Sequence, residues 1–145
     1  MADGKDQAFA QPVHKRRQYN EVRRSRRVLV VDDDAGVRTL LEECLGRWGY
    51  EVETAIHGAD GVLQARGSAV DLVITNYLMP GLSGIDVSKT IRSIKPDLPI
   101  ILISGYELTD IGLGNTDLID GFLMKPFELD DLKELLTKVN VQVEF

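Results

Sequence analysis

The chain contains few of the residues that form disulfides or zinc sites. Of its 145 residues, one is cysteine and two are histidine. A single cysteine excludes an internal disulfide and is typical of a reducing compartment, so we expect a cytoplasmic protein. Cys44 lies within an apolar helical pattern, which favours a buried, unreactive thiol over a nucleophile. His14 and His57 have no partners at the spacing of zinc ligands, and the sequence therefore predicts no zinc site.

Long hydrophobic runs are also missing. The longest apolar stretches, such as LPIILIS at residues 98–104, are far shorter than the ~20 residues of a membrane-spanning helix. Residues 1–18 carry charges without the apolar run and small-residue cleavage site of a secretory signal. We therefore expect a chain that neither enters a membrane nor is secreted.

Negative charge dominates, but it is unevenly distributed. The formal net charge is −6; residues 1–27 hold eight Lys or Arg against three Asp or Glu, which leaves nine against twenty for residues 28–145. The basic segment HKRRQYNEVRRSRR could touch nucleic acid or an anionic surface. Because so short a segment is not expected to fold into a specific binding surface, we interpret it as a solvated N-terminal extension and do not expect a nucleic-acid partner. The sequence thus predicts a flexible basic arm over 1–26, one domain over 27–139 and a tail over 140–145.

Apolar β-branched runs alternate with amphipathic segments along the predicted domain. The runs predict strands at residues 28–31, 50–54, 72–75, 100–103 and 122–124. Apolar residues at helical spacing predict helices at residues 35–48, 58–66, 85–94 and 129–139. Between the last two strands, Gly112, Gly114 and Asn115 weaken helix formation, so a further helix there is expected to be short or shifted. Continuous Val/Ile/Leu strands separated by helices predict a doubly wound α/β fold, with helices on both faces of a parallel sheet.

Polar side chains follow four of the predicted strands. They are, in chain order, Asp32, Asp33 and Asp34, then Asn76, Ser104 and Lys125. Ligands of doubly wound sheets bind at the carboxyl ends of the strands, so we expect these side chains to share one site. Asp34 is explained as the N-cap of the next helix. Neighbouring carboxylates repel one another, however, and Asp32 with Asp33 therefore predicts a cation or another functional role.

Four segments carry a resemblance to a known family: RVLVVDDDAGVRTLL, DLVITNYLMPGLSG, PIILISGY and DGFLMKPF. In this order and spacing they resemble the receiver domains of two-component response regulators, over nearly all of residues 27–139. The resemblance implies a five-stranded, flavodoxin-like sheet in the strand order 2-1-3-4-5. It also implies a signalling switch rather than an enzyme. Its expected partner is a sensor histidine kinase or a phosphotransfer protein within a phosphorelay.

The resemblance implies a magnesium site. Asp32 and Asp33 match the acidic pair that binds Mg²⁺, together with the side chain at position 76 and the backbone carbonyl of Leu78. Magnesium prefers hard oxygen ligands and keeps several waters, so two carboxylates and a carbonyl are sufficient ligands.

The resemblance also implies a phosphoryl site and a switch. Ser104 matches the hydroxyl that turns towards the phosphoryl group, and Lys125 matches the ammonium that pairs with the phosphoryl oxygens. Phe122 matches the aromatic switch residue whose rotamer follows that hydroxyl. The Lys125–Pro126 peptide bond is expected to be cis, an isomer that proline makes accessible.

Asn76 departs from the family pattern, because the family has its phosphoacceptor aspartate at this position. A carboxylate there attacks a phosphohistidine to form an acyl phosphate, whereas an amide cannot form this product. We therefore expect that the chain is not phosphorylated at the usual site. The residue is either an engineered Asp→Asn change or the mark of a natural receiver that signals without phosphate. The otherwise intact site slightly favours an engineered or recent change, or retained Mg²⁺ binding.

Three other functions compete with this interpretation. Asp32 could be the nucleophile of a small phosphohydrolase, although Gly36 stands where that family has Thr or Val. A flavin or nucleotide binder would need a Gly- or Ser/Thr-rich loop after the first strand, where this chain has three aspartates. The third alternative is a protein-binding module that acts without phosphate, and it would need neither a nucleophile nor a phosphate-binding loop.

Overall fold

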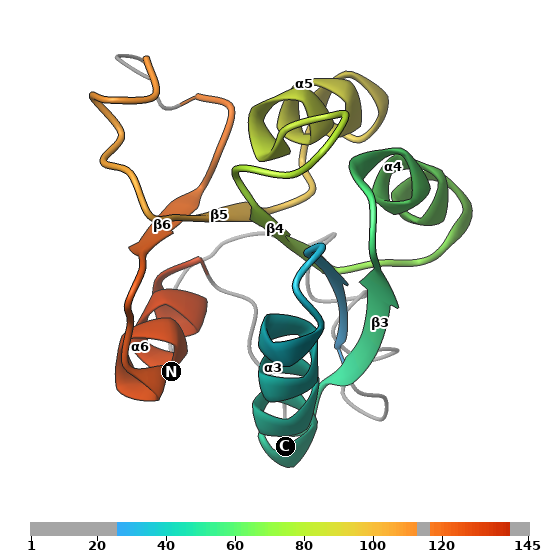
Figure 1. The fold of residues 1–145 in the computed structure, drawn as a ribbon. Coiled ribbons are helices and arrows are strands. Elements are labelled where there is room, and N and C mark those ends of the chain that lie inside the picture. Colours follow the sequence, from blue (N-terminus) through green and yellow to red (C-terminus); the bar gives the residue numbers. More distant parts are fainter. Residues whose placement is uncertain (1–25, 113–116, 140–145) are drawn as a thin grey trace, which may run out of the picture.

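Five parallel strands form the centre of the structure, a computed structural model that describes residues 26–112 and 117–139 (Figure 1). The strands are β2 (Arg27–Val31), β3 (Glu51–Ala55), β4 (Leu72–Asn76), β5 (Ile100–Ser104) and β6 (Gly121–Met124). They lie in the order β3-β2-β4-β5-β6, and every neighbouring pair is parallel. Numbered along the chain, this is the order 2-1-3-4-5, so the predicted fold class is confirmed.

All four helices predicted from apolar spacing are present. They are α3 (Ala35–Arg47), α4 (Gly58–Gly67), α5 (Gly84–Ile94) and α6 (Leu129–Lys138). The expected N-cap role of Asp34 is confirmed, because its side chain accepts hydrogen bonds from the first-turn amides of α3. This helix ends one residue earlier than expected: Trp48 caps it, and Gly49 follows with a φ of 99°.

Two apolar cores lie on opposite faces of the sheet. In Figure 1, α3 and α6 cover one face, and α4 and α5 cover the other. Successive residues of β2 alternate between the cores: Val28 and Val30 pack towards α3 and α6, and Leu29 and Val31 towards α4 and α5. Burial on both faces explains why the central strands read as continuous apolar runs rather than alternating ones.

The connection between β5 and β6 differs from the expectation of a short or shifted helix. Its described residues, 105–112 and 117–120, form turns and bends without a helix, and 113–116 lie outside the described residues. Gly112 has a φ of 79°, a left-handed conformation that ends helical geometry. Apolar side chains along the connection, including Leu108, Ile111 and Leu118, still pack against the core shared with α4 and α5.

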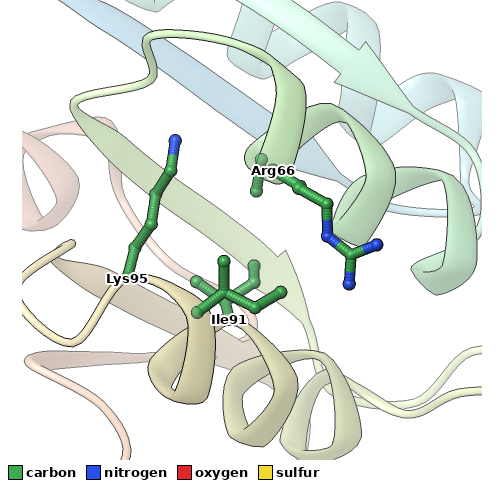
Figure 2. A pocket seen from close by; sticks show the side chains of 5 residues that line it. Arg66, Ile91 and Lys95 are labelled. Carbon is green, nitrogen blue, oxygen red and sulfur yellow. The ribbon is translucent and has the colours of Figure 1, made fainter.

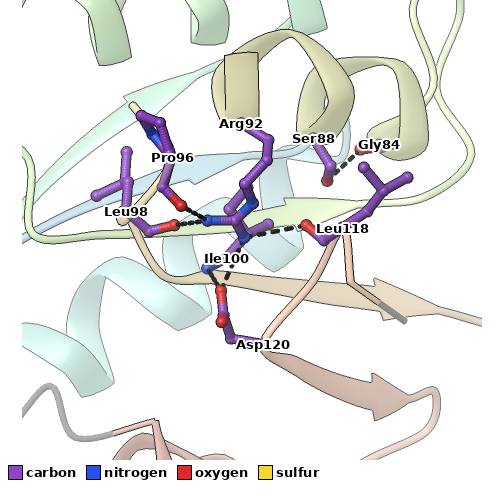
Figure 3. Close-up of polar contacts among 8 residues, drawn as sticks. All are labelled: Gly84, Ser88, Arg92, Pro96, Leu98, Ile100, Leu118 and Asp120. Atoms are coloured by element: carbon purple, nitrogen blue, oxygen red, sulfur yellow. Dashed lines mark hydrogen bonds and ion pairs between the residues drawn. The ribbon is translucent and has the colours of Figure 1, made fainter. Parts of the chain in front are cut away.

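One arginine of α5 forms hydrogen bonds with this connection (Figure 3). From α5, Arg92 donates through Nη1 to the carbonyls of Pro96 (2.7 Å) and Leu98 (2.8 Å). Its Nη2 donates to the carbonyl of Leu118 (3.1 Å) and to a carboxylate oxygen of Asp120 (2.9 Å). A single guanidinium therefore joins α5 to the segments before β5 and before β6.

The predicted arm (1–26) lies outside the described residues apart from residue 26, and the predicted tail (140–145) lies outside them entirely. Among the residues that the structure describes, no helix combines the length and apolar character needed to cross a membrane.

Candidate functional site at the carboxyl ends of the strands

The sheet register brings the predicted site residues to one edge. Val31 pairs with Thr75, so Asp32 and Asn76 follow side by side on neighbouring strands. Ser104 ends β5, the next strand along. Lys125 follows β6, and its backbone N–H donates to the carbonyl of Ser104 (2.8 Å). Side chains far apart in the sequence therefore share one rim because parallel strands all end there.

Asp32 is nearly enclosed, with 1% of its surface exposed. Its Oδ1 accepts a hydrogen bond from the backbone N–H of Asp34 (2.9 Å), but its buried Oδ2 has no hydrogen-bond partner. Burial raises the pKa of the Asp32 carboxyl, although the Asp34 N–H and the positive charge of Lys125 oppose the shift. A buried carboxylate oxygen without a partner is costly, and a cation would satisfy it.

The donor set fits Mg²⁺. Asp33 is exposed and follows Asp32, whose Oδ2 lacks a partner, so two carboxylates and one carbonyl, that of Leu78, are the hard-oxygen ligands to consider. Among the described residues, no group of three or more Asp, Glu, His or Cys side chains is placed to hold a metal ion. Asn76, on the strand beside Asp32, contributes a neutral amide rather than a carboxylate.

Asn76 is the last residue of β4 and is 7% exposed. Its amide nitrogen Nδ2 donates a hydrogen bond to the backbone carbonyl of Leu78 (2.8 Å). The side chain therefore faces one of the predicted metal ligands with a hydrogen-bond donor.

Ser104 and Phe122 occupy different surroundings. Ser104 is 1% exposed, and its hydroxyl oxygen accepts a hydrogen bond from the backbone N–H of Tyr106 (2.8 Å), which fixes the turn after β5. Phe122 is half-buried and packs against the core shared with α4 and α5. The Lys125–Pro126 bond is cis, as expected.

Two features of the rim were not singled out from the sequence. The rings of Tyr77 and Tyr106 meet edge to face, with centroids 6.2 Å apart, across the turns that leave β4 and β5. Gly84, the first residue of α5, lies so close to β4 that an added Cβ would collide with the backbone oxygen of Asn76. The sequence signals for these features were weak. Tyr77 and Gly84 lie in the DLVITNYLMPGLSG segment, and Tyr106 lies just after a predicted strand.

A shallow depression lies between α4 and α5, away from the strand ends (Figure 2). It is lined by Ala65, Arg66, Ile91, Ile94 and Lys95, and it has no room for a water molecule. Lys95 is already engaged, because its ammonium donates to the carbonyl of Ser68 (3.0 Å). This depression is a packing seam rather than a ligand site.

Comparison with known proteins decides the family. The model of the response regulator receiver domain matches residues 28–137. The chain belongs to the response regulator receiver domain family. Receiver domains are signalling modules of two-component systems, which agrees with the function that the resemblance implied.

The receiver has curated relatives that are longer than itself. It is 34% identical over 113 residues to the transcriptional regulatory protein ZraR of Salmonella typhimurium, covering 77% of this chain and 25% of that protein. It is 37% identical over 109 residues to the transcriptional regulatory protein PrrA of Mycobacterium leprae, covering 74% of this chain and 47% of that protein. The chain therefore spans between a quarter and a half of these relatives.

Solved receiver structures share the fold closely. The response regulator TrrA of Thermotoga maritima, crystallised with Mg²⁺ and BeF, has a TM-score of 0.73 and 38% identity, covering 79% of this chain and 98% of TrrA. A second structure holds TrrA in complex with the histidine kinase ThkA, with a TM-score of 0.70 and 37% identity over 79% of this chain and 98% of that one. The arrangement of strands described above is thus that of the receiver fold.

Proposed function

We propose that this receiver binds Mg²⁺ at the rim of the sheet and regulates a partner protein without being phosphorylated at residue 76. The observation that carries the proposal is the position of Asn76. It ends the middle strand β4, next to the buried Asp32 after β2 and to Ser104 at the end of β5. A nucleophile at this position would stand between the acidic pair and the hydroxyl, and the chain has an amide there.

The chemistry of each residue supports this assignment. A carboxylate at position 76 would attack a phosphorus atom and release the donor group; the Asn76 amide is neutral, and its nitrogen lone pair is delocalised into the carbonyl. Asp32, Asp33 and the Leu78 carbonyl would hold Mg²⁺, which supplies positive charge to a phosphoryl group. Lys125 would pair with phosphoryl oxygens, Ser104 would donate to them, and a change in Ser104 would reach Phe122.

Membership of the family supports a proposal for the partner and the location. TrrA is found in complex with a histidine kinase, and we propose that this receiver likewise meets a sensor histidine kinase or a phosphotransfer protein in the cytoplasm. The proposed boundaries of the receiver are residues 27–139, with a basic arm before it and a short tail after it. Because the chain covers only part of its curated relatives, their transcriptional regulatory activity is not assigned to it.

The experiment is a phosphorylation assay with acetyl phosphate and Mg²⁺, read by intact mass. Three proteins are compared: the chain itself, Asn76→Asp, and Asn76→Asp combined with Asp33→Ala as a control without the acidic pair. We expect a gain of one phosphoryl group in Asn76→Asp alone. If the unaltered chain is phosphorylated, the proposed role of Asn76 is wrong. If Asn76→Asp is not, the rim is not a receiver pocket, and a phosphate-independent binding module becomes the better description.

The competing phosphohydrolase would use Asp32 as its nucleophile. The near-complete burial of Asp32 and the hydrogen bond on its Oδ1 leave poor access for a substrate phosphorus, which supports the receiver function. Sustained turnover of p-nitrophenyl phosphate, lost in Asp32→Asn, would instead establish the enzyme.

A further inference from the structure

The amide group of Asn76 is hydrogen-bonded to the loop that follows β4. Its Nδ2 lies 2.8 Å from the backbone oxygen of Leu78. This oxygen is the carbonyl that, in the function proposed above, would face Mg²⁺. The side chain of Leu78 is exposed, so its backbone rather than its side chain belongs to the site.

The orientation of the amide follows from hydrogen-bond chemistry. The nitrogen has two donors and no free lone pair, and only the nitrogen can make a favourable contact with a carbonyl oxygen at this distance. Its N–H groups carry partial positive charge. A cation bound to the same carbonyl would therefore lie close to a positive donor. Magnesium also demands near-octahedral oxygen ligands, and an amide nitrogen cannot supply one.

The rest of the loop is anchored from within the chain. The backbone N–H of Tyr77 donates to the carbonyl of Ile103 (2.7 Å), and the N–H of Gly84 donates to the carbonyl of Tyr77 (2.7 Å). With the Asn76 bond to Leu78, the start of the loop is held at two successive residues. The opposite side of the rim differs, because the buried Oδ2 of Asp32 has no hydrogen-bond partner. One half of the site is thus satisfied without metal and the other half is not.

We propose that Asn76 is an internal substitute for the cation: its amide occupies the Leu78 carbonyl, holds the β4–α5 loop in place without metal, and weakens Mg²⁺ binding. This inference rests on the proposed receiver function and adds a second role to Asn76 beyond the loss of a nucleophile. Mg²⁺ at the Leu78 carbonyl must share this oxygen with the Asn76 N–H or displace it, and either costs binding energy. The conformation of the β4–α5 loop in this chain therefore depends little on Mg²⁺.

Asn76→Ala separates this role from the loss of charge. Alanine lacks the donor but, like asparagine, carries no charge, so it frees the carbonyl without adding an anionic ligand. We expect Asn76→Ala to bind Mg²⁺ about threefold to tenfold more tightly than the unaltered chain, the range that one neutral hydrogen bond represents. We expect Asn76→Asp to bind most tightly. Equal or weaker binding by Asn76→Ala would overturn the proposal, since it would mean that the Asn76 side chain is neutral to the metal or ligates it.

The measurement is a Mg²⁺ titration followed by the amide NMR shifts of residues 32–34 and 77–78, which report on this site alone. Asp33→Ala is the matched control, because it should abolish the shifts while leaving the Asn76 hydrogen bond intact. Circular dichroism of each variant establishes that it is folded.

Amide hydrogen exchange gives a second test without metal. In EDTA, exchange at Tyr77, Leu78 and Gly84 should be slower in the unaltered chain than in Asn76→Asp, because aspartate cannot donate to the Leu78 carbonyl. Added Mg²⁺ should slow exchange in Asn76→Asp and change it little in the unaltered chain. Faster exchange in the unaltered chain would contradict the proposal even if Asn76→Ala did not fold. Phosphorylation of Asn76→Asp is read separately by mass, so the receiver function can hold while this inference fails.

Discussion

At the scale of single residues, Asp32 is the buried carboxylate of the candidate site. One of its carboxylate oxygens is buried without a partner, and its pKa is raised chiefly by burial. Asp32→Asn keeps the acceptor for the Asp34 N–H but removes the buried charge. We expect it to raise the free energy of unfolding by about 1–2 kcal/mol at neutral pH in EDTA, because a buried neutral amide costs less desolvation than a buried carboxylate.

Urea unfolding measures this change, and the exposed Asp33 provides the control, since Asp33→Asn should alter stability little. An Asp32→Asn protein no more stable than the unaltered chain in EDTA would show that Lys125 already compensates the buried charge.

Cys44 is expected to make the free energy of unfolding depend on pH. The thiol is buried, and burial raises its pKa above the ordinary value of 9.0. Above pH 9 the thiol of the unfolded chain ionises while the folded thiol stays protonated, so the unfolded state binds fewer protons and stability falls as pH rises. Cys44→Ala lacks this titration. The difference in unfolding free energy between the two proteins should therefore shrink from pH 8 to pH 10; a constant difference would mean that the folded thiol ionises normally.

At the scale of elements, the approach of α5 to β4 depends on Gly84. An added Cβ would collide with the backbone oxygen of Asn76 and lie 2.8 Å from a methyl carbon of Leu102. Gly84→Ala must push α5 away from the strand that carries the site, and we expect a loss of about 2–3 kcal/mol, as for other overpacked positions. Gly46 of α3 is the matched control, because a Cβ there meets nothing within 4 Å.

Gly46→Ala should instead stabilise by about 1 kcal/mol through helix propensity. Thermal unfolding of the two variants beside the unaltered chain gives both changes. A Gly84→Ala protein as stable as the unaltered chain would show that α5 shifts at no cost.

The connection between β5 and β6 depends on Arg92 in place of a helix. Its guanidinium bonds three carbonyls and Asp120, and the Asp120 carboxylate also accepts from the backbone N–H of Ile100 (2.9 Å) (Figure 3). Arg92→Ala removes the guanidinium donor from the carbonyls of Leu98 and Leu118, whose hydrogen bonds are part-buried, so we expect a loss of about 2 kcal/mol.

Arg92→Lys should recover only part of this loss, because an ammonium cannot reach four acceptors in the same fork geometry. Chemical denaturation gives the loss, and amide exchange at residues 118–120 shows whether it is local. Full recovery by lysine would mean that charge alone, rather than the fork of hydrogen bonds, holds the connection.

At the scale of the molecule, the two cores share one sheet. In β2 and β4, successive apolar residues belong to opposite cores. Neither core can be lost while the sheet remains intact, so we expect a single cooperative unfolding transition. Trp48 packs against the core of α3 and α6 and reports on that face by fluorescence, whereas far-UV circular dichroism reports on all elements. Their urea midpoints should coincide; separate midpoints would mean that the two faces unfold independently.

Local sequence patterns predict the strands, the four helices, the sheet class and the residues that lie at its rim. These follow from local patterns: runs of apolar residues, helical spacing, and the fact that parallel strands place their carboxyl ends together. The strand order came from the family resemblance, since periodicity does not say which strands are neighbours.

The hydrogen bonds of the rim residues, in contrast, are known only from the packed fold. The Asn76 amide turns to Leu78, the Asp32 Oδ2 lacks a partner, and Arg92 reaches Asp120 across 28 residues of sequence. The same holds for the β5–β6 connection, where a helix was expected and turns are found in the described part. Such features depend on which donors and acceptors are brought within about 3 Å after the elements have packed, and no local pattern of residues encodes that distance.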